Sequence, residues 1–168
     1  MKVIREFDYD AIKEFIRGSH PESIIMIGCD SVRKDVNGKA FATYATVVCV
    51  RKSSGAGVYH GSKLFSSLVK MPDYGKVIKS GKIANLKVRM MQEVTFALEA
   101  FGNLQDVLED RIWEIHVDIN SRSDCESHVA LNDAKGYVMG VTGQEPMFKP
   151  IGLAASFAAD AVAHGLIQ

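Results

Sequence analysis

Two hydrophobic patterns divide the chain into expected strands and expected helices. Residues 24–30 begin with four apolar residues that do not alternate, which is typical of a strand buried on both faces of a sheet. Residues 41–50 are rich in Val, Thr and aromatic side chains and predict a second strand, and residues 58–66 predict a third. Asn37-Gly38, a strong hairpin turn signal, separates the first two. We therefore expect the chain to open with an antiparallel three-strand meander.

An apolar stripe with helical spacing begins near residue 85. Its members recur every three or four positions and share one face of a long helix: Leu86, Met90, Val94, Ala97, Phe101, Leu104 and Leu108. Glu93 falls within the arc of this stripe, three residues after Met90. Because an unpaired carboxylate is costly at a core-facing position, Glu93 needs a partner.

The rest of the chain alternates between strand and helix patterns. Residues 112–119 and 146–149 predict a fourth and a fifth strand, and residues 123–139 and 153–164 predict helices. Because a crossover helix connects the first strand to the fourth, these two strands are expected to be parallel neighbours. We therefore predict an α/β fold whose mixed five-stranded sheet has antiparallel strands 1–3, then parallel strands 4 and 5, and helices on both faces.

The length of 168 residues favours a single domain with a sizeable core. Residues 1–22 are expected to form an N-terminal helical extension, whose short helix is capped by Asp8 or Asp10 and ends at Gly18. Residues 23–168 are expected to form the main domain.

The composition, 47% hydrophobic and 24% charged, is ordinary for a globular protein. No apolar run reaches transmembrane length, and no basic-then-apolar leader opens the sequence. We therefore expect a cytoplasmic protein without a membrane partner. The three cysteines lack metal-type spacing and are odd in number, which argues against a zinc ribbon and a disulfide framework.

The net charge is zero, but the charges are distributed unevenly. Residues 63–89 hold seven basic side chains and one acid, whereas residues 90–133 hold ten acids and two bases. This asymmetry can hold a polyanion beside a metal site. We therefore predict a basic insert at about 63–89 that loops out of the fold and binds nucleic acid through Lys76, Lys79, Lys82, Lys87 and Arg89. A solvated lysine loop is the alternative.

Four acids occupy positions where a carboxylate is unexpected. Asp30 and Asp118 end buried strands, and Glu93 and Asp160 lie on helix faces that are otherwise apolar or small. Parallel neighbouring strands would bring Asp30 and Asp118 side by side, and crowded carboxylates repel one another unless cations neutralise them. Hard oxygen ligands suit Mg²⁺ or Mn²⁺. Two such ions about 4 Å apart form the clamp that is used for phosphodiester hydrolysis.

The order of these acids resembles the ribonuclease H-like superfamily and, more narrowly, the YkuK family of ribonuclease H-like proteins. The resemblance covers roughly residues 23–165 and rests on Ile27-Gly28-Cys29-Asp30-Ser31, Gln92-Glu93-Val94, His116-Val117-Asp118-Ile119, Lys149-Pro150 and Ala155-Ser156-Phe157-Ala158-Ala159-Asp160. The family pattern would have threonine where Cys29 stands and glycine where Asn120 stands.

The resemblance implies a ribonuclease H-like fold and gives the four acids roles as metal ligands. Asp30 and Asp118 would be the central ligands, with Asp30 bridging both ions. Glu93 would hold the ion on the leaving-group side, and Asp160 the ion that activates water. The superfamily's resolvases act as dimers, so a homodimer is a further option.

Three other side chains are candidates for the site. Lys149, near the end of the fifth strand, would contact the scissile phosphate or be a surface lysine. His116 shares a sheet face with Asp118 and would support the site or carry a proton, or else be a packed core residue. His164 follows Asp160 by one helical turn and would orient water, or interact with the helix dipole.

These features predict a metal-dependent nuclease that hydrolyses RNA or DNA by a two-metal-ion mechanism. The alternative is a nucleic-acid-binding scaffold of the same fold without catalytic activity. An actin-like ATPase is disfavoured because no glycine-rich phosphate hairpin follows Asp30, and a serine hydrolase because no Gly-x-Ser-x-Gly elbow occurs. A mononuclear zinc site would require His116, Asp118 and His164.

Overall fold

The computed structural model describes residues 1–37, 39–73, 82–120, 128, 130–149 and 153–165, with only the backbone at 36, 82–85, 120 and 153–157. In chain order, its elements are β1 (Lys2–Arg5), α1 (Tyr9–Gly18), β2 (Ile24–Val36), β3 (Lys39–Gly55), β4 (Val58–Pro72), α2 (Lys82–Leu104), the 3₁₀ helix η1 (Gln105–Val107), β5 (Ile112–Asn120), α3 (Leu131–Thr142), β6 (Met147–Lys149) and α4 (Leu153–Ala163).

The strands form one mixed sheet in the order β1-β4-β3-β2-β5-β6. The neighbouring pairs β1–β4, β4–β3 and β3–β2 are antiparallel, and the pairs β2–β5 and β5–β6 are parallel. The predicted α/β fold is confirmed, including the parallel pairing of the first and fourth predicted strands. Among the described residues, the sheet has six strands rather than five. The additional strand is β1, which is short and mostly exposed and gives no strand-like apolar pattern.

Several boundaries differ from the prediction. Strand β2 continues past Asp30 to Val36, where polar residues conceal the strand pattern. The predicted hairpin turn follows it, and Asn37 has a positive φ of 51°. Helix α3 begins at Leu131, and the predicted start of that helix at residues 123–124 lies outside the described residues. In the described part of the chain, no helix is long and apolar enough to cross a membrane.

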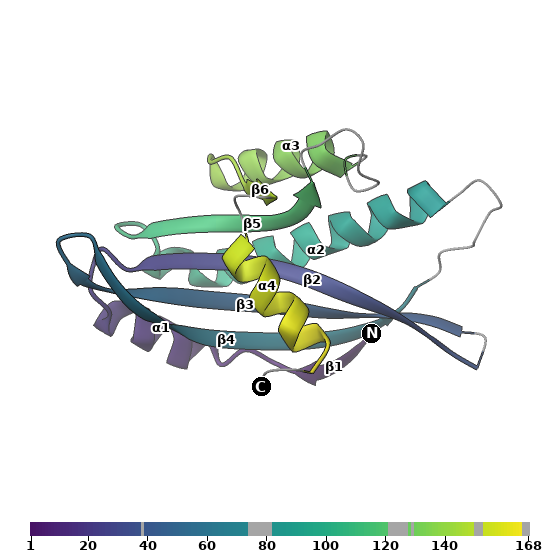
Figure 1. Ribbon diagram of the computed structural model, residues 1–168, viewed down its shortest axis with the longest axis horizontal. Helices are drawn as coiled ribbons and strands as arrows, with labels where there is room; N and C mark the ends of the chain where they lie inside the picture. Colours follow the sequence, from purple (N-terminus) through teal and green to yellow (C-terminus); the bar gives the residue numbers. More distant parts are fainter. Residues whose placement is uncertain (38, 74–81, 121–127, 129, 150–152, 166–168) are drawn as a thin grey trace.

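Helices cover both faces of the sheet, as predicted (Figure 1). On one face, α1 and α2 bury Ile12, Ile16 and Val94 in one cluster with Ile25 and Ile27 of β2. On the other face, α4 crosses the strands, and its Ala159 and Val162 pack in a second cluster. The alternating residues of β2 supply both clusters because successive strand side chains point to opposite faces.

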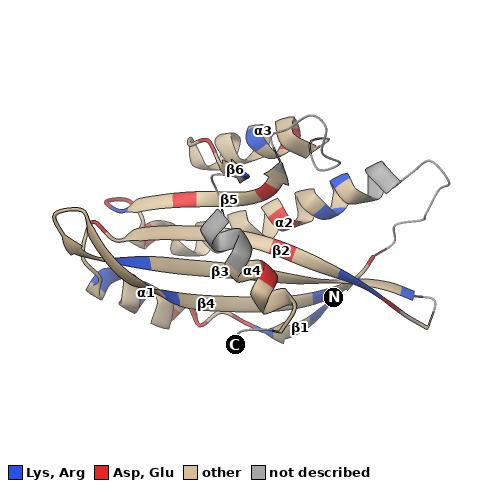
Figure 2. Ribbon diagram, viewed as in Figure 1, with Lys and Arg blue, Asp and Glu red and all other residues tan. Residues whose placement is uncertain are grey.

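The predicted basic insert does not loop out of the fold over the whole of residues 63–89. Residues 63–72 belong to β4 and residues 82–89 to α2, and Figure 2 shows basic residues on both elements. The segment between them, residues 74–81, includes Lys76 and Lys79 and lies outside the described residues, as does the side chain of Lys82.

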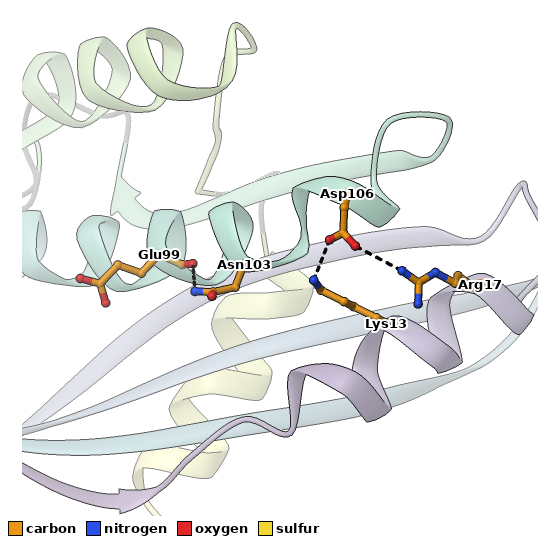
Figure 3. Close-up of polar contacts among 5 residues, drawn as sticks. All are labelled: Lys13, Arg17, Glu99, Asn103 and Asp106. Atoms are coloured by element: carbon orange, nitrogen blue, oxygen red, sulfur yellow. Dashed lines mark hydrogen bonds and ion pairs between the residues drawn. The ribbon is translucent and has the colours of Figure 1, made fainter.

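The N-terminal residues contribute both the edge strand β1 and the expected helix. Asp8 caps α1 by accepting a hydrogen bond from the Ala11 backbone N–H at 3.0 Å, as one of the two predicted caps. In Figure 3, Asp106 of η1 accepts from Lys13 at 2.8 Å and Arg17 at 3.2 Å, which ties α1 to the end of α2. These contacts and the buried Ile12 and Ile16 make α1 part of the main core.

Candidate functional site

Asp30 and Asp118 lie at the point where the β2–β5 ladder stops. The last paired residues are Cys29 and Val117, so each carboxylate follows at the next position of its strand. Gly28 pairs with His116 two residues earlier, which puts Asp30 and Asp118 on the same face of the sheet. Both side chains are half-buried. Neighbouring strands therefore deliver two carboxylates to one edge of the ladder, as the sequence predicted.

Glu93 reaches this region from α2 and is buried, with 6% of its surface exposed. Its Oε1 accepts a hydrogen bond from Ser31 Oγ at 2.6 Å. The Ser31 backbone N–H donates to Asp30 Oδ1 at 2.7 Å. Ser31 therefore connects two of the acids through different atoms. Our sequence reading did not assign it a role, although its position directly after Asp30, on the opposite face of β2, was a usable signal.

The four carboxylates interact electrostatically. Burial raises the pKa of Asp30 to about 6, and the negative charges of Asp118 and Asp160 add to this rise. Burial raises the pKa of Glu93 to about 8, with further contributions from Asp30 and Asp118. Hydrogen bonds from Ser31 oppose both shifts. The structure thus brings together the predicted set of acids, although Asp160 remains exposed on α4.

Lys149 of β6 forms an ion pair with Asp118 through its Nζ and the Asp118 Oδ1. Its charge also lowers the pKa of Asp30 against the other contributions. Lys149 is partly exposed, with 33% of its side-chain surface accessible. It therefore belongs to the candidate site and supplies a positive charge within the group of acids, which differs from the isolated surface lysine of the alternative interpretation.

The two candidate histidines each contact an acid. His116 is buried, and its Nε2 lies 2.8 Å from Glu114 Oε2. Glu114, His116 and Asp118 alternate along one face of β5, so Glu114 was detectable from the strand spacing but was not singled out. His164 follows α4, and its Nδ1 lies 3.0 Å from Asp160 Oδ1. The predicted neighbourhood of each histidine is thus present.

The structure places two predicted nucleic-acid contacts against other parts of the protein. Lys87 forms an ion pair with Asp133, which joins α2 to α3. Arg89 is half-buried one turn before Glu93, and its positive charge lowers the pKa of Glu93. Its Nε is buried without a hydrogen-bond partner among the described residues. Arg89 thus lies in the helix that the apolar stripe predicted, and its contact with nucleic acid stays a prediction.

The donor set matches the chemistry of a divalent cation. Carboxylate oxygens are the ligands that Mg²⁺ and Mn²⁺ prefer, and a cation beside Asp30 and Glu93 would offset the charge repulsion that raises their pKa values. In the described ranges, no group of three or more His, Cys, Asp or Glu side chains has an arrangement ready to hold a metal ion.

Comparison with known proteins agrees with this geometry. A family model described as Ribonuclease H-like matches residues 9–164. No curated protein and no solved structure shows a significant match to the chain. The match covers nearly the whole chain. It includes all four acids of the candidate site: Asp30, Glu93, Asp118 and Asp160. The chain therefore belongs to the ribonuclease H-like family, in the YkuK group that its motifs resemble.

Proposed function

We propose that this protein is a divalent-metal-dependent nuclease that hydrolyses phosphodiester bonds of RNA or DNA with two Mg²⁺ or Mn²⁺ ions. The observation that supports this most is the gathering of acids where the β2–β5 ladder ends, where burial, with the negative charges of Asp30 and Asp118, raises the pKa of Glu93 to about 8. Groups with perturbed pKa values cluster at functional sites. Family membership supports the coarser statement that the function is nuclease-like or related to nucleic acids.

Each acid has a role in this proposal. Asp30 and Asp118, side by side at the end of the β2–β5 ladder, would bind the ions between them. Glu93 and Asp160 would complete the ligand set from α2 and α4. Divalent ions at such a site activate water and stabilise the leaving oxygen. Ser31 would keep Glu93 and Asp30 oriented before binding.

The basic and imidazole groups would act on the substrate and on protons. Lys149, beside Asp118, would contact the scissile phosphate. His164, in contact with Asp160, would orient the attacking water. His116, held by Glu114, would support Asp118 from the same face of β5. The proposal further includes a cytoplasmic location, which cell fractionation tests, and a homodimer, which light scattering of the purified protein tests.

The test is incubation of the protein with labelled single strands, duplexes, RNA–DNA hybrids and branched junctions in the presence of Mg²⁺ or Mn²⁺. We expect cleavage by the wild type and a loss of at least about 100-fold in Asp118→Asn, because one metal ligand changes charge. Asp110→Asn is the matched control, since Asp110 is an exposed aspartate in the turn before β5. If no substrate is cut, or if Asp118→Asn cuts as well as the control, the nuclease proposal is wrong.

One observation favours a second candidate, a nucleic-acid-binding scaffold without catalysis. The Lys149 ammonium already pairs with Asp118, which neutralises one carboxylate without a metal. Calorimetric titration with Mn²⁺ separates the two candidates. Binding that disappears in Asp118→Asn supports the nuclease, whereas the absence of metal binding together with binding of nucleic acid supports the scaffold.

A further inference from the structure

The face of the sheet that carries Asp30 continues beyond α4. Asp30 pairs in register with Ala45 of β3, and Ala45 pairs with Leu68 of β4. Ala45 and Leu68 pack in the cluster formed with Ala159 and Val162 of α4, so this row of residues lies on the α4 side. Residues two positions further along each strand lie on the same side. Figure 1 shows β2 and β3 extending past α4 in this direction.

Each set of residues paired across the strands on the Asp30 side forms a row, and a row occurs at every second strand position. Lysines occupy the three successive rows beyond the row of Asp30. The first row holds Lys70 opposite Lys2, the second holds Lys34, and the third holds Lys39. At about 3.4 Å per residue, these rows lie roughly 7, 14 and 20 Å from the Asp30 row. Lys2, Lys34 and Lys39 are exposed and Lys70 is partly exposed. We call these four side chains the lysine rows, and Figure 2 shows basic residues on these strands.

Asp35 and Asp73, the acids beside the outer two rows in the described part of the chain, lie on the other side of the sheet. Asp35 is one residue from Lys34 along β2, so its side chain points to the opposite face. There Arg33 pairs with Asp35 at 3.8 Å and with Asp73 at 3.4 Å. The charges of this end of the sheet are therefore sorted by face, with lysines on the side of Asp30.

The pairing of Lys2 with Lys70 is unfavourable by itself. The two residues lie directly opposite each other in the β1–β4 ladder, and like charges at such positions destabilise a sheet. Lys70 Nζ lies 4.6 Å from the centre of the Phe41 ring in the next row, which offsets part of this repulsion. A polyanion bound across the rows would remove the rest, which gives this arrangement a functional explanation.

We propose that the lysine rows bind the phosphate backbone of a single strand of RNA or DNA and lead it to the carboxylates. This inference rests on the proposed function and names its substrate track. The rows advance in one direction from Asp30, as a single backbone would, and the half-buried Phe41 ring lies between them as a surface for base stacking. The track shares Lys70 with the basic insert that the sequence indicated, whereas Lys2, Lys34 and Lys39 lie outside that insert.

The experiment measures binding of fluorescent single-stranded oligonucleotides by anisotropy, in EDTA and over a series of salt concentrations. The test variant is Lys34→Gln with Lys39→Gln. The matched control is Lys52→Gln with Lys63→Gln, which removes two lysines from the other end of the same β3–β4 hairpin. Urea unfolding of both variants checks that the fold is intact, so a change in binding reports on the contacts.

We expect the test variant to lose about 1.4 units of the slope of log K against log salt, since each phosphate contact of a single strand contributes about 0.7. At 0.1 M salt this corresponds to an affinity loss of roughly 25-fold. The control should bind like the wild type. An unchanged slope in the test variant, an equal loss in the control, or the absence of binding by the wild type would each overturn the proposal.

Two further readouts identify what the rows bind and separate this proposal from the nuclease. If the oligonucleotide binds with a salt slope that falls in the test variant, but is not cleaved in Mg²⁺, the proposal for the lysine rows is supported and the nuclease proposal fails. Cleavage that the test variant performs as well as the wild type at limiting substrate overturns the track but keeps the nuclease. If phosphatidylserine vesicles bind through the same lysines and the oligonucleotide does not bind, this face binds a membrane and the nucleic-acid track is overturned.

Discussion

Ser31 is the residue that links the acids of the candidate site. Its backbone N–H donates to Asp30 and its hydroxyl donates to Glu93. Adjacent strand residues point to opposite faces, so Ser31 can face α2 while Asp30 faces the α4 side. Burial and the negative charges of Asp30 and Asp118 raise the pKa of Glu93, and the hydrogen bond from Ser31 lowers it. This balance makes the protonation of Glu93 sensitive to single substitutions.

Ser31→Ala should raise the pKa of Glu93 above about 8, because the hydroxyl that lowers it is removed. The free energy of unfolding should fall by about 1–3 kcal/mol, since a buried carboxyl loses a partner. NMR titration of carbon-13-labelled Glu side chains measures the first effect and urea unfolding the second. Ser31→Thr retains the hydroxyl and should titrate like the wild type. An unchanged Glu93 titration in Ser31→Ala would remove Ser31 from the site.

Without divalent cations, the stability of the protein should decrease as the pH rises from about 5 to 9. The folded-state pKa values of Asp30, about 6, and Glu93, about 8, lie above their ordinary values of 3.8 and 4.5. The folded state therefore binds more protons than the unfolded state in this window, and the protonated forms are lost as the pH passes each folded pKa. Urea unfolding in EDTA at several pH values measures this. Glu93→Gln should flatten the decrease between about pH 5 and 8, and an equally steep curve would contradict the assignment.

At the scale of elements, α4 brings Asp160 over the sheet through small side chains. Ala159 is fully buried and Val162 is 2% exposed, and both pack against Met26, Val47 and neighbouring residues. Small residues at this contact let the helix backbone come close to the strands. Asp160 follows Ala159 directly, so the distance between helix and sheet also sets the position of this carboxylate.

Ala159→Leu should lift α4 from the sheet and destabilise the protein by about 1–3 kcal/mol, the usual effect of overpacking. Asp160 would move away from Asp30, so the nuclease activity that we propose should fall more than the stability change explains. Urea unfolding and cleavage assays below the unfolding transition measure the two effects. Ala11→Leu, at an exposed position of α1, is the control. Wild-type stability in Ala159→Leu would mean that α4 does not pack as described.

At the scale of the whole molecule, the N-terminal residues are continuous with the main core. Ile12 and Ile16 of α1 are fully buried in the same cluster as Ile25 of β2 and Leu104 of α2. Strand β1 pairs with β4 at the edge of the sheet. The residues that we expected to form a separate helical extension thus share their packing with the domain.

Ile16→Ala should lower the free energy of unfolding by about 2–5 kcal/mol, because it leaves a cavity under α1. Deletion of residues 1–22 should prevent the rest of the chain from folding cooperatively. Urea unfolding followed by circular dichroism tests both. Ile4→Ala removes a side chain that is 54% exposed and should change stability by less than about 0.5 kcal/mol. A cooperative transition in the deleted chain at wild-type stability would restore the view of a dispensable extension.

Much of the fold was predictable because strong apolar patterns mark its buried elements. The unbroken run at the start of β2 and the stripe of α2 face packed surfaces, and burial is what produces such patterns. Strand β1 and the outer half of β2 were not predictable from an apolar pattern, because their residues are polar or exposed. Backbone hydrogen bonding to neighbouring strands, rather than burial of side chains, makes them strands. The same reason accounts for residues 67–72, which follow the predicted third strand, were expected to loop out and lie in β4.

The sequence by itself determined which acids are available and which elements carry them, because each interrupts an apolar pattern at a strand end or a helix face. Only the tertiary structure decided their partners: Ser31 between Asp30 and Glu93, Lys149 on Asp118, the positive charge of Arg89 near Glu93, and Glu114 on His116. Lys34 shares a face with Asp30 because four residues separate them on one strand, but only the strand register decided that Lys2, Lys39 and Lys70 lie on that face. A shift of one residue would move every one of these side chains to the opposite face, and no local pattern of polar residues specifies that register.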